Sequence, residues 1–170
     1  MITHIFFILF FFISLTLKAS ADCENPPADG SIYSGCSWAD NEDLSSTYMP
    51  NASLEFINAL GSVWDKSMMM NTKFENSQLE NSSWLRANLY ESSFKFSNLS
   101  NSIWDGANLV NSNFEGSMLI NASFKGCLMN NINLSGAVIE GAVFDMSNLS
   151  GATWTDGTVC LQGSVGECKK

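Results

Sequence analysis

Cysteine is the residue type whose spacing most directly suggests chemistry in this chain. Its five copies are Cys23, Cys36, Cys127, Cys160 and Cys168. In an oxidising compartment, cysteines that lie close in sequence favour local disulfides, which predicts Cys23–Cys36 and Cys160–Cys168 near the two ends. Spacing alone does not fix the connectivity, and free thiols are the alternative. Cys127 falls at an expected inward position, which predicts a buried packing thiol.

The chain contains few of the residue types that catalysis usually requires. The chain has one histidine, His4, and this lies in the amino-terminal segment that we expect to be removed. Without it, the remaining chain can form neither a Ser-His-Asp nor a Cys-His arrangement, nor a histidine metal site. The 17 acidic side chains are scattered along the chain and do not indicate a catalytic pair. We therefore predict that the protein is not an enzyme, with no catalytic residue, cofactor or metal.

The amino-terminal segment is typical of a secretory signal peptide. An apolar run, IFFILFFFISLTL, covers residues 5–17 and is followed by the small-residue pattern Ala19-Ser20-Ala21. The run is shorter than the roughly 20 residues that a membrane span needs. We predict that residues 1–21 are cleaved after Ala21 and that the protein is secreted or periplasmic. An uncleaved membrane anchor is the alternative.

The charge of the chain limits its partners. Removing residues 1–21 takes away one of the eight basic side chains and no acidic one, so the formal charge changes from −9 to −10. This charge disfavours contact with phosphate backbones and anionic membranes. We expect no nucleic-acid partner, and no membrane partner once the signal peptide is removed. An unidentified protein or envelope component is the expected partner, and a homodimer remains open.

A five-residue repeat organises the rest of the sequence. Every fifth residue from Leu44 to Trp154 is apolar, the residue two positions earlier is almost always small, and the residue two positions later is mostly Asn or Gly. This period fits neither an α-helix nor a flat strand. It fits a coil in which each pentapeptide forms one side, because residues two apart then point inward together. Asn and Gly follow at the corners, where turns favour them.

The identity of the large residues sets the length of the coil. Aromatic and aliphatic residues largely alternate along the column, so a coil of four pentapeptides sorts them into separate stacks. One expected wall holds Trp64, Trp84, Trp104, Phe124 and Phe144, and the opposite wall holds Phe74, Phe94 and Phe114. Small inward residues let the walls approach and fill the interior. The sequence thus predicts an all-β, four-sided parallel β-helix of about five to six coils, with bridges between residues that stand four pentapeptides apart.

Two features of the pattern carry further expectations. The pattern falters between Phe56 and Leu60, where Ile57 takes a small position and Ala59 a large one. A bulge is the favoured interpretation, with a docking patch as the alternative. On the outer surface, acidic and basic residues at equivalent positions of successive coils predict two charge ladders: Glu75–Lys95–Glu115 and Asp105–Lys125–Asp145.

The repeat resembles a known family, the pentapeptide-repeat proteins, whose consensus is Ala-(Asp/Asn)-Leu-x-x. Matching segments include Ala87-Asn88-Leu89, Ala107-Asn108-Leu109 and Ser147-Asn148-Leu149. The resemblance covers residues 42–156 and implies a right-handed quadrilateral β-helix. Residues 30–38 and 151–168 resemble the opening and closing segments of exported family members.

The resulting domain prediction has four parts. A signal peptide occupies residues 1–21, an N-terminal cap residues 22–41, the pentapeptide-repeat β-helix residues 42–156, and a C-terminal cap residues 157–170. Both ends are expected to be capped by disulfides. The predicted function is a non-enzymatic, exported, rigid binding or scaffold module with an unidentified ligand. The alternative, which the resemblance suggests, is an acidic DNA mimic that engages a type II topoisomerase, although gyrase is cytoplasmic and export argues against it.

Overall fold

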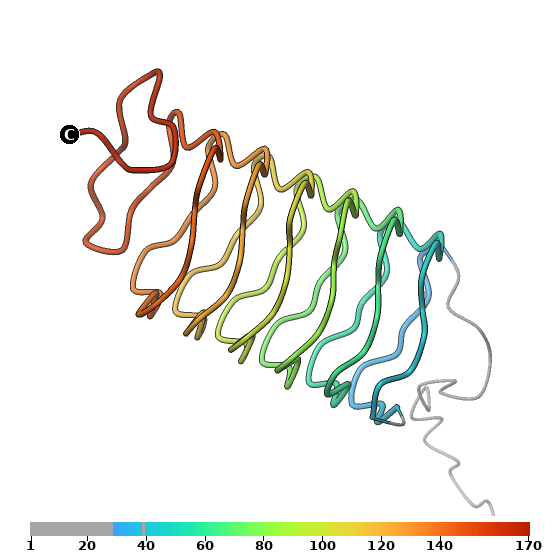
Figure 1. Cartoon of the computed structure of the whole chain (residues 1–170). Helices are drawn as coiled ribbons and strands as arrows, with labels where there is room; N and C mark the ends of the chain where they lie inside the picture. The colour runs from blue at the N-terminus through green and yellow to red at the C-terminus, as the bar shows by residue number, and fades with distance from the viewer. Residues whose placement is uncertain (1–28, 39) are drawn as a thin grey trace, which may run out of the picture.

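The computed structural model describes residues 29–38 and 40–170. In this part of the chain the backbone winds into a regular stack of coils (Figure 1). The coils are joined by isolated single-residue bridges that recur every fifth residue. The described residues contain no helix and no strand longer than one residue. The predicted signal peptide, residues 1–21, lies outside the described residues, as does Cys23 of the predicted Cys23–Cys36 disulfide.

The bridges set the length of one coil. Val63 pairs in parallel with Ser83, and Ser83 pairs in parallel with Ile103. The same spacing holds at every parallel bridge from Asp43↔Val63 to Asn133↔Thr153. Since a bridge falls on every fifth residue and each bridge joins residues four pentapeptides apart, each coil has four sides. This is the pairing that the alternation of aromatic and aliphatic residues predicts.

The corners explain the Asn and Gly column. The residue two positions after each large inward residue from Leu44 to Leu149 has a positive φ, for example 56° at Asn71 and 74° at Gly106. Gly adopts this left-handed conformation without a steric penalty, and Asn tolerates it better than most residues do. Asn side chains also join neighbouring coils, since Asn131 donates to Asn111 across 3.1 Å and Asn121 donates to Asn101 across 3.4 Å.

The interior is built from stacked rings. The Trp84 ring lies between those of Trp64 and Trp104, with centroid distances of 5.2 and 4.8 Å and interplanar angles of 7° and 2°. Rings from the opposite wall meet them edge-on, as Phe94 does with Trp84 at 5.4 Å and 87°. The predicted stack residues are all buried: Trp64, Trp84, Trp104, Phe124, Phe144, Phe74, Phe94 and Phe114. Such offset and edge-to-face contacts stabilise the core beyond the burial of their area.

The coil begins earlier than the predicted boundary at residue 42. Parallel bridges already join Ile32 to Ser53 and Ser37 to Asn58, each spacing being one residue longer than in the later coils. One additional residue between Trp38 and Leu44 explains the longer spacing, because Trp38 packs on the core and stands six residues before Leu44 in the sequence. The predicted N-terminal cap, residues 22–41, therefore includes part of the β-helix. Cys36 is buried there, and its pairing with Cys23 stays a prediction.

The carboxyl end closes the coil by reversing the chain. Val159 and Val165 form antiparallel bridges with Thr153 and Asn148. The disulfide Cys160–Cys168 joins the two parts of this closing segment, as predicted. Antiparallel pairing covers backbone groups of the last coil that would otherwise form an open edge.

The irregular segment from Phe56 to Leu60 is not a bulge, which corrects the interpretation favoured from the sequence. The bridges before, within and after the segment, Ser53↔Lys73, Asn58↔Gln78 and Val63↔Ser83, all keep the spacing of four pentapeptides. Ile57 and Ala59 are 1% and 0% exposed, so both point inward. The large and small residues have exchanged positions, which conserves the interior volume without disturbing the pairing.

Candidate functional site

Bulky and charged side chains occupy several corners where Asn or Gly would strain the backbone less. A left-handed φ between 56° and 60° occurs at Phe56, Lys66, Arg86, Glu91, Phe96 and Met146. For an L residue this conformation costs roughly 1–2 kcal/mol. Strained positions with exposed side chains are therefore where a functional surface should be sought.

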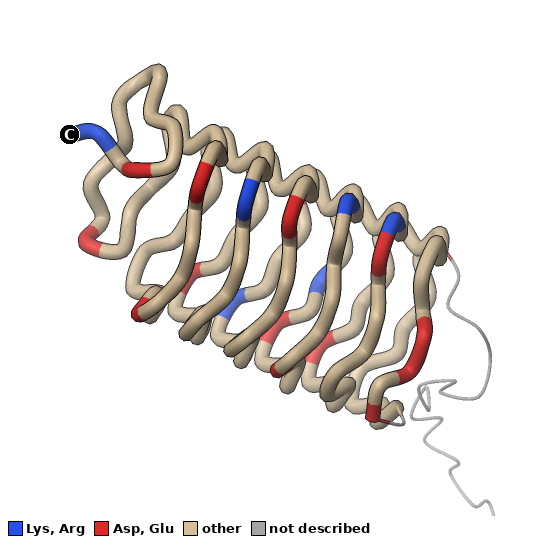
Figure 2. Tube along the Cα trace, viewed as in Figure 1, with Lys and Arg blue, Asp and Glu red and all other residues tan. Residues whose placement is uncertain are grey.

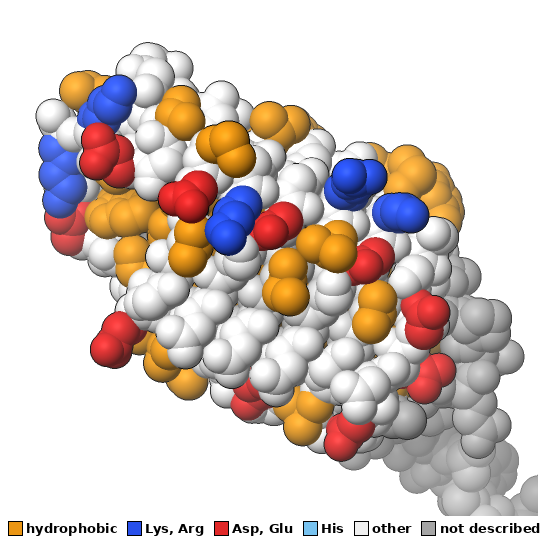
Figure 3. Space-filling model, in the orientation of Figure 1, with side chains coloured by type: hydrophobic (Ala, Val, Ile, Leu, Met, Phe, Trp, Pro, Cys, Tyr) orange, Lys and Arg blue, Asp and Glu red, His pale blue; other side chains and the backbone are white. Residues whose placement is uncertain are grey.

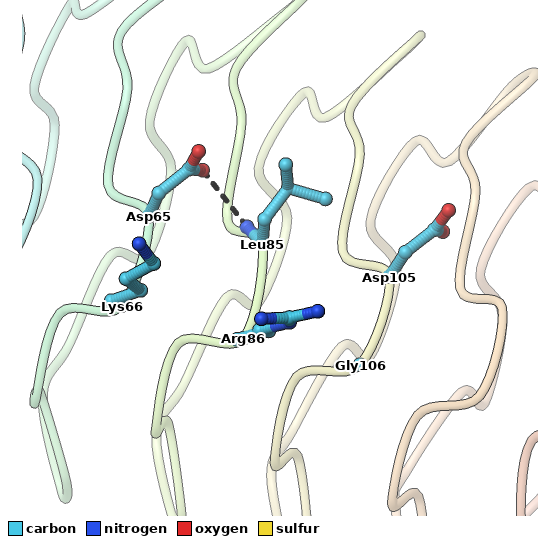
Figure 4. Close-up of a pocket in the computed structure, with 6 residues that line it drawn as sticks. All are labelled: Asp65, Lys66, Leu85, Arg86, Asp105 and Gly106. Atoms are coloured by element: carbon cyan, nitrogen blue, oxygen red, sulfur yellow. Dashed lines mark hydrogen bonds between the residues drawn. The ribbon is translucent and has the colours of Figure 1, made fainter.

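Two of these corners border a depression that is lined by two cations and two acids. Lys66 and Arg86 stand at the same corner of consecutive coils, and Gly106 follows on the next coil. With Asp65, Leu85 and Asp105 they line a shallow hollow of about 480 Å³ (Figure 4). A Cβ on Gly106 would lie 3.4 Å from Arg86 Cγ, so the Arg86 stem runs directly beside Gly106. The Arg86 side chain extends toward the coil of Gly106 (Figure 4).

The two acids of the hollow are held by the neighbouring coil. Asp65 Oδ1 accepts hydrogen bonds from the Ser83 hydroxyl at 2.6 Å and from the Leu85 amide at 2.9 Å. Asp105 Oδ1 repeats the pattern, accepting from the Ser123 hydroxyl at 2.6 Å and from the Lys125 amide at 3.0 Å. The acids thus serve as caps between coils, and among the described residues neither of them forms an ion pair with Lys66 or Arg86.

These caps also correct the predicted charge ladders. Lys95 pairs with Glu115 at 3.1 Å, as expected. Glu75 instead accepts a hydrogen bond from the Ser93 hydroxyl at 2.7 Å. Across residues 29–38 and 40–170, the only other ion pair joins Lys170 to Asp156, so Lys125 forms none. Acids at these positions reach a nearby hydroxyl or amide more easily than the end of a long lysine, whose ordering costs side-chain entropy.

A second edge displays aromatic side chains. The Phe96 ring lies over Gly116, where an added Cβ would come within 2.5 Å of Phe96 Cδ1. Lys95 Nζ stands 5.6 Å from the centroid of the same ring. Phe96 and Phe56 are 56% and 64% exposed, at equivalent corners two coils apart. Figure 3 shows that, on the face turned to the viewer, apolar side chains are scattered among charged ones and form no broad patch.

The buried thiol is not placed for chemistry. Cys127 is free and buried, as the sequence predicts, and its Sγ donates to the Trp104 carbonyl across 3.0 Å. Loss of hydration raises the pKa of this thiol to about 12, so it stays protonated and unreactive near neutral pH. Within the described part of the chain, no group of three or more His, Cys, Asp or Glu could hold a metal ion. The same residues contain no helix able to cross a membrane.

The residues that line the hollow are not among the site residues that the sequence predicts. Their signal is present in the corner column, which is otherwise mostly Asn or Gly and is interrupted by Lys66 and Arg86, four pentapeptides apart. That spacing places both cations on one corner only if the coil has four sides. The hydrogen bonds that tie Asp65 and Asp105 to the neighbouring coil cannot be predicted from the corner column.

Comparison with known families and structures gives one family. The family model described as pentapeptide repeats matches eight copies, over residues 67–103, 105–136 and 119–153. No curated protein matches in sequence. Among solved structures, the chain is similar to Rfr23, a pentapeptide repeat protein from the cyanobacterium Cyanothece 51142, with 18% identity and a TM-score of 0.44. That alignment covers 67% of this chain and 84% of Rfr23.

Two further solved structures are similar at the same level. HetL, involved in heterocyst differentiation regulation in Nostoc sp. strain PCC 7120, shares 19% identity with a TM-score of 0.33, over 78% of this chain and 74% of HetL. QnrB1, a plasmid-mediated fluoroquinolone resistance protein, shares 17% identity with a TM-score of 0.39, over 81% of this chain and 69% of QnrB1.

Proposed function

Because the chain belongs to the pentapeptide-repeat family, we propose that it acts as a rigid, exported binding or scaffold module and not as an enzyme. Stacked rings and a continuous ladder of parallel bridges give the molecule a fixed surface. A fixed surface suits recognition, because a preformed site loses little conformational entropy when it binds.

The placement of exposed side chains at strained corners is the observation that carries this proposal. Phe56, Lys66, Arg86 and Phe96 all have a left-handed φ, although Asn or Gly would fit the same corners better. A stability cost of this kind is typical of residues that are retained for function. The two cationic corners and the two aromatic corners therefore mark two candidate binding surfaces, at diagonally opposite corners of the four-sided coil.

Stability measurements on corner variants test the proposal. Each of Lys66→Asn, Arg86→Asn, Phe56→Asn and Phe96→Asn should raise the free energy of unfolding by up to about 1 kcal/mol, because Asn tolerates the left-handed region. Asn76→Arg, at a corner with a φ of 58°, is the matched reverse change and should lower it. If all four Asn variants are instead less stable than the parent, these side chains support the fold, and the proposed binding surface loses its basis.

Export is supported by the small-residue pattern that ends at Ala21 and by the Cys160–Cys168 disulfide, a bond typical of oxidising compartments. Fractionation of the source cells, followed by mass spectrometry of the purified protein, tests it. The expected product lacks residues 1–21 and is found outside the cytoplasm. A cytoplasmic product that retains residue 1 would contradict export.

The alternative function, a DNA mimic that engages a type II topoisomerase, is favoured by the formal charge of −10 expected after removal of residues 1–21. The distribution of charge speaks against it, because Lys and Arg alternate with Asp and Glu along one side of the coil stack (Figure 2). A mimic of duplex DNA needs a more uniformly negative surface. Protection of gyrase supercoiling by the purified protein would favour this alternative over a module that works outside the cytoplasm.

A further inference from the structure

We propose that the corner formed by Lys66 and Arg86 binds a sugar that carries a single anionic group, such as the carboxylate of a uronic acid. This inference rests on the proposed binding function and names a ligand class for one part of the surface. The anionic group would lie between the Lys66 ammonium and the Arg86 guanidinium, and the sugar ring would lie over Leu85 in the hollow.

The spacing of the two cations is the first support. Lys66 and Arg86 are equivalent corner residues of consecutive coils, which are joined by parallel bridges such as Val63↔Ser83 and Met68↔Asn88. Adjacent chains in such pairing lie about 4.8 Å apart. The two side chains therefore start from neighbouring backbone positions on one edge, and their flexible stems allow both charged ends to contact one carboxylate, phosphate or sulfate when it binds.

Neither cation forms an ion pair within the described residues, which is the second support. The ion pairs there are Lys95–Glu115 and Lys170–Asp156, and neither includes Lys66 or Arg86. Both side chains are exposed and sit on a strained corner. An arginine without an internal partner presents its planar set of donors to an external oxyanion, which it can bind in a bidentate manner.

The acids at the rim of the hollow limit the charge of the ligand. Asp65 and Asp105 use Oδ1 for their bonds to Ser83, Leu85, Ser123 and Lys125. Their Oδ2 atoms remain able to accept hydrogen bonds from ligand hydroxyls. The same two carboxylates repel a ligand with several negative charges, so a polyanion such as nucleic acid is disfavoured.

The remaining wall of the hollow completes the ligand class. Leu85 offers an exposed apolar surface between the two acids, and the C–H face of a sugar ring can pack on such a surface. A volume of about 480 Å³ lies within the range of small-molecule sites. Acceptors for hydroxyls, one apolar wall and two donors for a single anion together match an acidic sugar better than a free amino acid or an apolar ligand.

Calorimetric titration of the purified full-length product with four probes tests the inference. The probes are galacturonate, neutral galactose, galactose 6-phosphate and inorganic phosphate. We expect galacturonate to bind with a Kd of about 1 mM or tighter, as its size allows, and neutral galactose at least about tenfold more weakly. Galactose 6-phosphate distinguishes a site for any anionic sugar from one selective for a carboxylate, and both results support the inference.

Variants locate the site. Arg86→Asn and Lys66→Asn should each weaken galacturonate binding about tenfold or more, because each removes a charge-assisted contact. Lys125→Gln is the matched control, since it removes a cation on the same face that does not line the hollow, and its affinity should change less than about twofold. Thermal unfolding confirms that each variant is folded.

Three results would overturn the inference: no binding of either anionic sugar at about 10 mM, far above the expected Kd; equal binding of neutral galactose; or binding of inorganic phosphate as tight as that of the sugars. Unchanged affinity in both Arg86→Asn and Lys66→Asn would do the same. These failures leave the proposed binding function standing, because its own test is the stability of the four corner variants. If those variants all lose stability while the sugar still binds, the corner side chains support the fold and the proposed binding surface loses its basis, but the sugar site stands.

Discussion

The indole Nε1 of Trp84 donates a hydrogen bond to the Ser82 hydroxyl across 2.7 Å, inside the closed core. The same hydroxyl donates to the Leu79 carbonyl across 2.6 Å. The small inward residue is therefore more than a spacer. It supplies the acceptor that a buried indole requires, and it passes the bond on to the backbone of its own coil.

This relationship accounts for the choice of small residue along one wall. Where the large residue is tryptophan, the small residue two positions earlier is serine, in the pairs Ser62–Trp64, Ser82–Trp84 and Ser102–Trp104. Where the large residue is phenylalanine, the small residue is alanine, in the pairs Ala122–Phe124 and Ala142–Phe144. A phenyl ring has no donor, so a hydroxyl beside it would gain nothing from the ring.

We predict that Ser82→Ala lowers the free energy of unfolding by about 1–3 kcal/mol, because it leaves the buried Trp84 N–H without an acceptor. The double variant Ser82→Ala with Trp84→Phe reproduces the pair found at Ala122 and Phe124, and it should lose less than the sum of the two single changes. Urea unfolding of the four proteins in this cycle gives the coupling.

Ser112→Ala is the matched control for this cycle. Ser112 is equally buried, and its hydroxyl donates to the Leu109 carbonyl across 2.6 Å. The Ser112 amide also donates to that carbonyl across 3.1 Å, so the substitution leaves no group unpaired. It should cost only about 0.5–1.5 kcal/mol. Equal losses in Ser82→Ala and Ser112→Ala, or strict additivity in the double variant, would contradict the role given to the indole bond.

Truncation of the central ring tests the stack itself. Trp84→Ala removes a ring that contacts Trp64 and Trp104 on either side, and it should lower the free energy of unfolding by about 3–5 kcal/mol. Glu140→Ala is the control, because Glu140 is exposed, and its effect should stay below about 0.5 kcal/mol. Glu80 is less suitable, since its carboxylate accepts a bond from the Asn98 amide. Comparable losses in Trp84→Ala and Glu140→Ala would mean that the inward column is misassigned.

The inward and corner columns can be predicted from the sequence because they depend on residue size and on φ. Trp84, Asn71 and Gly106 each have one suitable place in a five-residue side, whatever their neighbours are. The coil length follows from the same logic, since mixing rings with aliphatic side chains in one stack would pack poorly. Local properties repeated many times thus determine most of this fold.

Features that depend on one insertion or on neighbouring coils cannot be predicted in this way. The column of large inward residues includes Tyr33 and Trp38, but one additional residue before Leu44 breaks the five-residue spacing. The repeat pattern alone therefore assigns the first coil to the N-terminal cap. Asp105 finds its partner in Ser123, 18 residues away, where the sequence favours a ladder of opposite charges with Lys125. Ordering a short acid beside a hydroxyl costs less side-chain entropy than ordering a long lysine. The five-residue sequence pattern does not show this difference in cost.

Because the Cys127 thiol is buried, the free energy of unfolding depends on pH in the alkaline range. Burial raises the pKa of Cys127 from 9.0 to about 12 in the folded protein. Above pH 9.0 the unfolded chain loses this proton while the folded chain keeps it, so the unfolded state binds fewer protons and the free energy of unfolding falls as pH rises. The contribution is complete below pH 9.0 and is lost progressively up to about pH 12.

Comparison of the parent with Cys127→Ala between about pH 8 and 10 measures this contribution. Alanine is a conservative choice, because Ala107 and Ala122 occupy the same inward column in neighbouring positions. The parent should lose stability faster than the variant above pH 9.0. A thiol reagent at about pH 8 should label Cys127 only after denaturation. Parallel pH profiles, or rapid labelling of the folded protein, would show that the thiol is accessible.

The last prediction concerns how the carboxyl end protects the coil. Replacing Cys160 and Cys168 together by serine opens a loop with a sequence separation of eight residues, which should lower the free energy of unfolding by about 2–3 kcal/mol. The loss should be local, because each coil contacts only its neighbours and a solenoid frays from an end. Amide exchange should accelerate at Leu149 and Gly151, which donate to the closing segment. It should remain slow at Trp84, whose amide donates to the Ile103 carbonyl in the centre of the stack. Equal acceleration at all three amides would mean that the disulfide stabilises the whole coil stack as one unit and not its end.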